Sequence, residues 1–184
     1  MRRTAKQKQK DSAITKAAKP AKGKASKAPP SIRGSLDGAK LRIGIVTARF
    51  NSDITSELES GALRTLVKLG VRSKNIRCVS VPGAVEITVA AQALLKSGSD
   101  AVIALGCVIR GETTHYESVV GVVDRGCTHL QLETGRPVVF GVITTENKEQ
   151  ALDRIGGRHG HKGEDAAEVA VEMANLLKDK TFRK

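Results

Sequence analysis

Residues 101–109 read Ala-Val-Ile-Ala-Leu-Gly-Cys-Val-Ile and are followed by Arg-Gly-Glu-Thr-Thr at 110–114. The first stretch carries no charged side chain, and a strand that is apolar on both faces is typical of a parallel sheet with helices on each side. In the second stretch, glycine favours a turn and the two threonines favour the start of a helix. We therefore predict a buried strand, a turn, and a helix that carries Val119, Val123 and Leu130.

The same alternation of apolar strands and amphipathic helices extends in both directions along the chain. The other predicted strands are 41–48, 76–81 and 137–144, and the other predicted helices are about 52–69, 84–96, 148–155 and 165–178. We expect the side chain of Asn51 or Ser52 to cap the first of these helices and Gly70 to end it. Four such units predict an α/β fold, a three-layer α-β-α sandwich around a four-stranded parallel sheet.

The positive charge is concentrated at the N-terminal end. The chain has 184 residues with 31 Lys and Arg against 19 Asp and Glu; residues 1–35 carry a net charge of +10 and residues 36–184 carry +2. Residues 1–35 contain few large aliphatic side chains, so we predict a disordered Lys-rich tail before a single domain over 36–184. Three interpretations of the tail stay open: a solvated extension, a weak non-specific contact with nucleic acid or another polyanion, and a transit peptide.

Cysteine usage and hydropathy bear on the compartment. Cys78, Cys107 and Cys127 are odd in number and lack CxxC spacing, so we expect neither a disulfide framework nor a zinc site, and a reducing, cytoplasmic location. No apolar run approaches the roughly 20 residues of a membrane span, so no membrane partner is expected.

In a parallel sheet of this kind, ligands bind at the carboxyl ends of the strands. The residues that follow the four predicted strands are Phe50 and Asn51, residues 82–86, residues 110–115, and residues 144–147. Phe50 either offers a flat face to a planar ring or fills the core. The turn at 111–114 either binds an anion such as phosphate or serves as an ordinary helix cap. His115 follows this turn, and histidine can transfer protons near neutral pH.

A glycine-rich stretch, residues 153–163, separates the last two predicted helices. No strand precedes it and the GxxxxGK spacing is absent, so nucleotide hydrolysis is disfavoured. Arg154 and Lys162 either offer charges to an anion that another part of an assembly brings, or lie solvated in a helix connection. His159 and His161 have no carboxylate or cysteine at ligand spacing, so we expect surface residues and no metal site.

Five segments carry a family resemblance. They are Ala48-Arg-Phe-Asn51, Val81-Pro-Gly-Ala-Val-Glu-Ile87, Gly106-Cys-Val-Ile-Arg-Gly-Glu-Thr-Thr-His-Tyr116, Gly141-Val-Ile-Thr-Thr-Glu-Asn147 and His159-Gly-His-Lys-Gly163. In this order they resemble the 6,7-dimethyl-8-ribityllumazine synthase family. The resemblance runs from about Leu41 to Leu177 and leaves the tail outside.

The resemblance implies a flavodoxin-like fold and a transferase of riboflavin biosynthesis. In its penultimate step, members of the family condense 5-amino-6-(D-ribitylamino)uracil with 3,4-dihydroxy-2-butanone 4-phosphate and release phosphate and water, without a metal or organic cofactor. The pyrimidine's own amine is the nucleophile, which agrees with a chain that shows no nucleophile and base constellation.

The resemblance also implies roles for individual residues. His115 would be catalytic and transfer protons. The pyrimidine-binding residues would be Phe50, Asn51, Ala84, Val85, Glu86, Val108, Ile109, Phe140 and Lys162, and the phosphate-binding residues would be Gly111, Glu112, Thr113 and Arg154. Of these, Phe140, Arg154 and Lys162 would come from a neighbouring subunit. The place of Phe140 in the middle of a predicted strand favours a core position on its own. The resemblance implies a site role for Phe140 instead.

A shared site implies a homopentamer, which some members of the family assemble further into a decamer or a sixty-subunit shell. Two other functions stay in view. An inactive flavin-binding or lumazine-binding relative would keep Phe50, but the presence of both His115 and Arg154 argues against it. A basic nucleic-acid-binding protein would carry its charge on a folded face, whereas residues 36–184 are nearly neutral.

Overall fold

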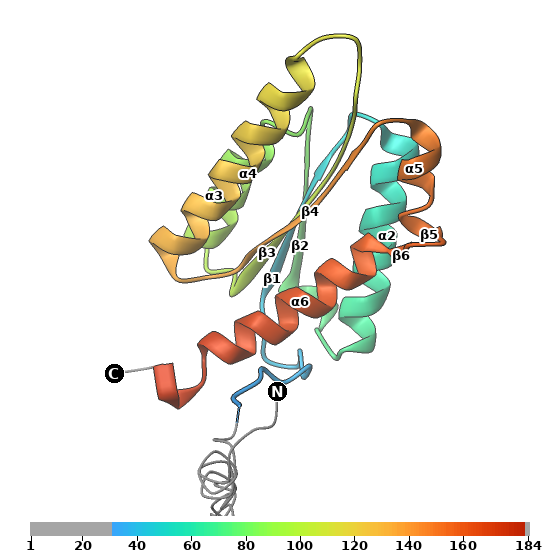
Figure 1. Cartoon of the computed structure of the whole chain (residues 1–184). Helices are drawn as coiled ribbons and strands as arrows, with labels where there is room; N and C mark the ends of the chain where they lie inside the picture. The colour runs from blue at the N-terminus through green and yellow to red at the C-terminus, as the bar shows by residue number, and fades with distance from the viewer. Residues whose placement is uncertain (1–30, 183–184) are drawn as a thin grey trace, which may run out of the picture. The chain divides into compact units, whose positions relative to one another are not determined.

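A parallel four-stranded sheet forms the centre of the molecule (Figure 1). The computed structural model describes residues 31–182, so all but the last five residues of the predicted tail, 1–35, lie outside the described residues. The strands are β1 (Ile43–Ala48), β2 (Ile76–Val81), β3 (Ala101–Ile109) and β4 (Val138–Thr145), in the order β2-β1-β3-β4. The predicted fold class is confirmed.

Helices cover both faces of the sheet, as Figure 1 shows. Helices α3 (Ile87–Lys96) and α4 (His115–Thr134) lie on one face, and α2 (Ser52–Lys68), α5 (Lys148–Leu152) and α6 (Lys162–Leu177) lie on the other. Two short 3-10 helices lie at Ser73–Asn75 and Lys180–Phe182. Neighbouring residues of β1 alternate between two buried clusters: Ile45 packs in the cluster with α2 and α6, and Val46 in the cluster with α3 and α4. This alternation explains why the strand is apolar throughout.

Close packing of α6 on α2 requires glycine at position 163. A Cβ atom at Gly163 would lie 2.0 Å from the backbone oxygen of Leu58, well inside van der Waals contact. The first turn of α6 therefore lies directly against the backbone of α2, and it fixes the segment that precedes α6.

The segment between α5 and α6 differs from the prediction. The predicted helix 148–155 ends at Leu152, and a hairpin of β5 (Ile155–Gly157) and β6 (Gly160–His161) follows. Gly156 and Gly160 have positive φ angles of 116° and 72°, which glycine adopts without strain and which do not continue a helix. The last helix begins at residue 162 and not at 165, because the Nδ1 atom of His161 accepts a hydrogen bond from the backbone N–H of Glu164 at 3.4 Å.

The start of the described chain is joined to α6. The side-chain amide of Asn175 donates hydrogen bonds to the carbonyl oxygens of Ser35 at 2.7 Å and Asp37 at 2.9 Å. The backbone there is irregular up to β1. Among residues 31–182, no helix has the length and apolar character that a membrane crossing requires.

Candidate active site

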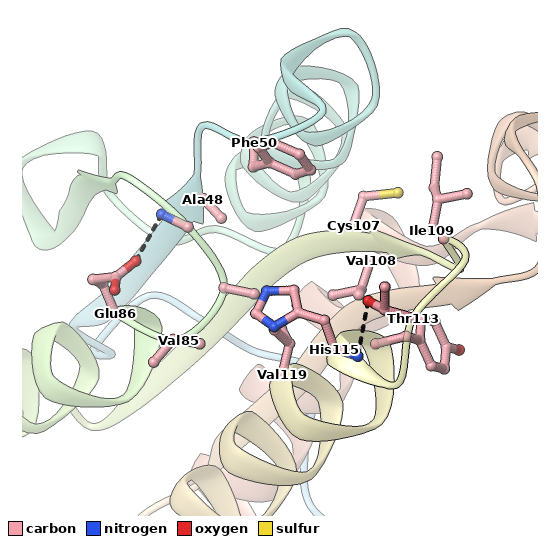
Figure 2. A pocket seen from close by; sticks show the side chains of 14 residues that line it. Ala48, Phe50, Val85, Glu86, Cys107, Val108, Ile109, Thr113, His115 and Val119 are labelled. Atoms are coloured by element: carbon pink, nitrogen blue, oxygen red, sulfur yellow. Dashed lines mark hydrogen bonds between the residues drawn. The ribbon is translucent and has the colours of Figure 1, made fainter.

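A cavity of about 390 Å³ opens at the carboxyl ends of β1, β2 and β3. Figure 2 shows Phe50 and His115 on opposite sides of this space. The lining residues are Ala48, Phe50, Gly83, Ala84, Val85, Glu86, Cys107, Val108, Ile109, Gly111, Thr113, His115, Tyr116 and Val119. Nine of the fourteen residues with a predicted site role, His115 among them, line this cavity. Asn51 and Glu112 are chain neighbours of lining residues.

The loop after β1 presents Phe50 to solvent. Its side chain is 71% exposed, so Phe50 is not a core residue. Asn51 has the left-handed conformation (φ 59°, ψ 50°), and its side-chain amide donates a hydrogen bond to the carbonyl of Cys107 at 3.0 Å. The predicted cap is therefore wrong: α2 begins without a side-chain cap, because the Asn51 side chain is used to join the ends of β1 and β3.

The loop after β2 is held by a carboxylate. Glu86 accepts a hydrogen bond from the backbone N–H of Gly83 at 2.9 Å, which Figure 2 marks. This bond closes a tight turn over residues 83–86, so α3 begins at residue 87 and not at 84 as predicted. Val85 lines the cavity and is 41% exposed, while Ala84 is buried. The turn therefore gives the cavity one apolar wall with a carboxylate beside it.

The turn after β3 leads directly into the N-terminus of α4. Residues 111–115 are all exposed, and the hydroxyl of Thr113 accepts from the backbone N–H of His115 at 3.4 Å. The N-terminal amide groups of a 20-residue helix attract anions through the helix dipole. An apolar wall, an aromatic ring, a helix N-terminus and an imidazole together suit a planar ring next to a small anion.

The residue roles that the resemblance implies leave out five lining residues: Ala48, Gly83, Cys107, Tyr116 and Val119. Four of them lie within the quoted segments, and Val119 follows His115 by one helical turn, which is the signal that identifies it. Burial raises the pKa of the Cys107 thiol to about 11, so this group is protonated near neutral pH and is not a thiolate nucleophile.

An ion pair joins the starts of two helices, α2 and α5. Lys148 Nζ lies 2.6 Å from the Asp53 carboxylate and joins the first turn of α2 to the first turn of α5. This lysine lowers the pKa of Asp53 below its usual range. Both side chains are more than half exposed, so the pair positions the two helix starts but adds little to overall stability.

Phe140, Arg154 and Lys162 lie apart from the first cavity. They line a second hollow of about 410 Å³ beside β4 and α6, which shares no lining residue with the first. Phe140 is 38% exposed, so the core position expected from its place in the strand is wrong: β4 is an edge strand without a neighbour among the described residues on its outer side. Lys162 Nζ pairs with Asp165 at 2.7 Å.

The sequence profile of one family, described as 6,7-dimethyl-8-ribityllumazine synthase, matches residues 40–178. The chain belongs to this family. The resemblance that the five segments indicate is thus confirmed.

Curated relatives with the same name agree with this assignment. The protein of Bdellovibrio bacteriovorus is 51% identical over 140 residues, which are 76% of this chain and 77% of the relative. That of Paracidovorax citrulli is 52% identical over 145 residues, 78% of this chain and 92% of the relative. That of an Acidovorax species is 53% identical over 145 residues, which are 78% of this chain and 92% of the relative.

The lumazine synthase segments divide between the two hollows. The segments at 48–51, 81–87 and 106–116 contribute to the first, whereas those at 141–147 and 159–163 contribute to the second. A single subunit therefore carries two separate groups of the family's segments.

Proposed function

We propose that the chain catalyses the lumazine synthase reaction. It condenses 5-amino-6-(D-ribitylamino)uracil with 3,4-dihydroxy-2-butanone 4-phosphate, releases phosphate and water, and thereby performs the penultimate step of riboflavin biosynthesis. Membership of the family, with three of its segments gathered at one cavity, is the observation that carries this proposal.

In the proposed reaction, the first cavity holds the pyrimidine. The ring stacks on Phe50, and Val85 with Ile109 supplies apolar surface around it. Backbone groups of Val108 and Ile109, at the end of β3, bind the polar edge of the ring. Asn51, Ala84 and Glu86 bind the ribityl chain. The hydroxyl groups of this chain can donate hydrogen bonds to the carboxylate of Glu86.

The phosphate ester binds at the N-terminus of α4. Gly111, Glu112 and Thr113 form the turn there, and its N–H groups with the helix dipole favour the anion. The amine of the pyrimidine attacks the ketone carbonyl of the butanone phosphate and forms an imine with loss of water. Phosphate then leaves, and ring closure releases a second water. Neither a metal nor an organic cofactor is needed, because the substrates supply both the nucleophile and the leaving group.

His115 transfers protons in these steps. Its side chain lines the cavity opposite Phe50 and is exposed, so it can exchange protons with solvent (Figure 2). Much of the rate comes from holding the two substrates together in the right orientation.

The site is completed by a neighbouring subunit, which contributes Phe140, Arg154 and Lys162. The separation of these residues from the first cavity within one chain supports this arrangement. Exposed apolar side chains support association in general: Val89, Val122 and Leu132 are 66%, 41% and 81% exposed. We propose a homopentamer in the cytoplasm, which a decamer or a sixty-subunit shell would extend.

The reaction is tested by incubating the purified full-length protein with both substrates. Lumazine fluorescence and free phosphate should appear together and only when both substrates are present. Phosphate release without the pyrimidine, or no product from a well-folded protein, would contradict the proposed function.

A further inference from the structure

Arg110 joins three segments at the mouth of the cavity. It follows β3 directly, and its Nε atom lies 2.8 Å from a carboxylate oxygen of Glu146, just after β4. A terminal guanidinium nitrogen pairs with Glu117 in the first turn of α4. The guanidinium carbon also lies 4.1 Å from the centre of the Tyr116 ring. One side chain thus connects the end of β3, the start of α4 and the loop after β4.

The backbone supports the same connection. The N–H of Arg110 donates to the carbonyl of Thr145 at 2.9 Å, which continues the pairing of β3 with β4 to the last residue before the turn. Two of the three guanidinium nitrogens pair with carboxylates. Hydrogen bonds to Glu117 and Glu146 raise the pKa of Arg110 above its usual value, and the hydrogen bond from Arg110 lowers the pKa of Glu117. A planar fork with two carboxylates and an aromatic ring is an arrangement that lysine cannot reproduce.

The turn that Arg110 precedes has few other contacts. A Cβ atom at Gly111 would meet nothing within 4 Å among the described residues, and residues 111–114 are exposed. Thr114, the residue before α4, makes no side-chain cap hydrogen bond. The turn is therefore held mainly at its two ends, by Arg110 on one side and by Tyr116 and Glu117 on the other, and the Arg110 cluster joins these ends.

The geometry points to Arg110 as a positioning residue for the lumazine synthase reaction: by holding Glu117 and Glu146 it fixes the turn that binds the phosphate ester and the His115 that follows. This inference rests on the proposed function, which assigns the phosphate to that turn. In this inference Arg110 acts through the two carboxylates and not on the phosphate, because its Nε atom faces Glu146 and one terminal nitrogen faces Glu117. Because the pairs are partly exposed, their loss should affect substrate binding more than overall stability.

The test separates positioning from direct phosphate binding through the carboxylates. Arg110→Ala should raise the KM for 3,4-dihydroxy-2-butanone 4-phosphate by about 10-fold, since misplaced binding groups cost affinity, while pyrimidine binding changes less than about twofold. Glu146→Gln should raise the same KM by about threefold, and should add nothing in the Arg110→Ala background, as expected for coupled residues. Arg110→Lys should restore only part of the loss.

The opposite result for Glu146→Gln overturns the inference. If Arg110 contacted the phosphate directly, freeing it from Glu146 would leave this KM unchanged or lower it. Should Arg110→Ala prevent assembly, as judged by light scattering, Glu146→Gln and Arg110→Lys still decide the question.

Two control variants complete the design. Arg64→Ala removes another exposed arginine. Arg64 lies on α2 and pairs with Glu164 of α6 at 3.4 Å, so this variant should leave the KM for the phosphate ester unchanged. Thr113→Val tests the phosphate site itself: an unchanged KM would contradict the proposed site. If Thr113→Val raised this KM and Arg110→Ala left it unchanged, the positioning role of Arg110 would be contradicted and the proposed phosphate site would stand.

Discussion

Replacing Phe50 by alanine tests the proposed ring stacking. Phe50 is 71% exposed and belongs to neither buried cluster, so its removal should leave the melting temperature unchanged. Loss of stacking between an aromatic side chain and a heterocyclic base costs about 1 to 3 kcal/mol. The Kd of the pyrimidine substrate should therefore rise by about 5-fold to 160-fold.

The assay is a titration of the full-length protein with the pyrimidine substrate alone, so that chemistry does not contribute. Phe50→Leu keeps apolar area without a flat ring and should recover only part of the affinity. Phe182→Ala, at another exposed phenylalanine in the last 3-10 helix, is the matched control. Binding to Phe50→Ala within twofold of the unsubstituted protein would refute the stacking role, and a lowered melting temperature would indicate a core role instead.

The remaining substitutions address proton transfer, phosphate binding, helix packing and the buried thiol. His115→Ala should lower kcat by about 10-fold to 100-fold, and complete inactivity of a folded variant would mean that His115 does more than transfer protons. Arg154→Ala should raise the KM for the phosphate ester and spare pyrimidine binding; equal damage to both, by titration and kinetics, would point to misassembly. Gly61→Ala would place a Cβ atom 2.1 Å from the His161 ring, so it should destabilise the protein by about 1 to 3 kcal/mol in denaturant unfolding, and His161→Asn, which keeps a capping side chain, should relieve this loss if the clash is its cause. Cys107→Ala should keep kcat within about threefold at neutral pH, because the thiol pKa of about 11 leaves it protonated there; a much larger loss in a stopped assay would implicate the sulfur.

Much of the fold is predictable because local signals agree with the packing. The runs 76–81 and 101–109 are strands over the predicted residues, since turn or polar residues bound them on both sides. The predicted helix 148–155 is too long, because the two glycines with positive φ angles after it favour a hairpin that helical periodicity does not reveal. Ile155 fits the apolar spacing of a helix and also that of a short strand. Its antiparallel strand pairing with His161, which the sequence does not show, places it in a strand.

The site was predictable only in part, because some roles depend on contacts distant in the sequence. Asn51 is a good candidate for a helix cap by its position. Its side chain instead donates a hydrogen bond to the carbonyl of Cys107, 56 residues away in the chain. Phe140 looks like a core residue within one strand, and its exposure follows from the edge position of β4, which the sequence pattern does not specify. The Arg110 cluster joins residues 110, 117 and 146 through three elements, so no single motif shows it.

The central claim is that each site contains Phe50 and His115 of one subunit with Arg154 of another, and subunit mixing tests it most directly. Phe50→Ala and Arg154→Ala subunits are unfolded together in equal amounts and reassembled, and lumazine formation is compared with each variant alone, at substrate concentrations so low that each variant alone is nearly inactive. Random mixing around a ring restores about a quarter of the sites to intact composition, so activity should rise to about a quarter of the unsubstituted value. Activity of the mixed assembly that stays at the mean of the two variants would contradict a site shared between subunits.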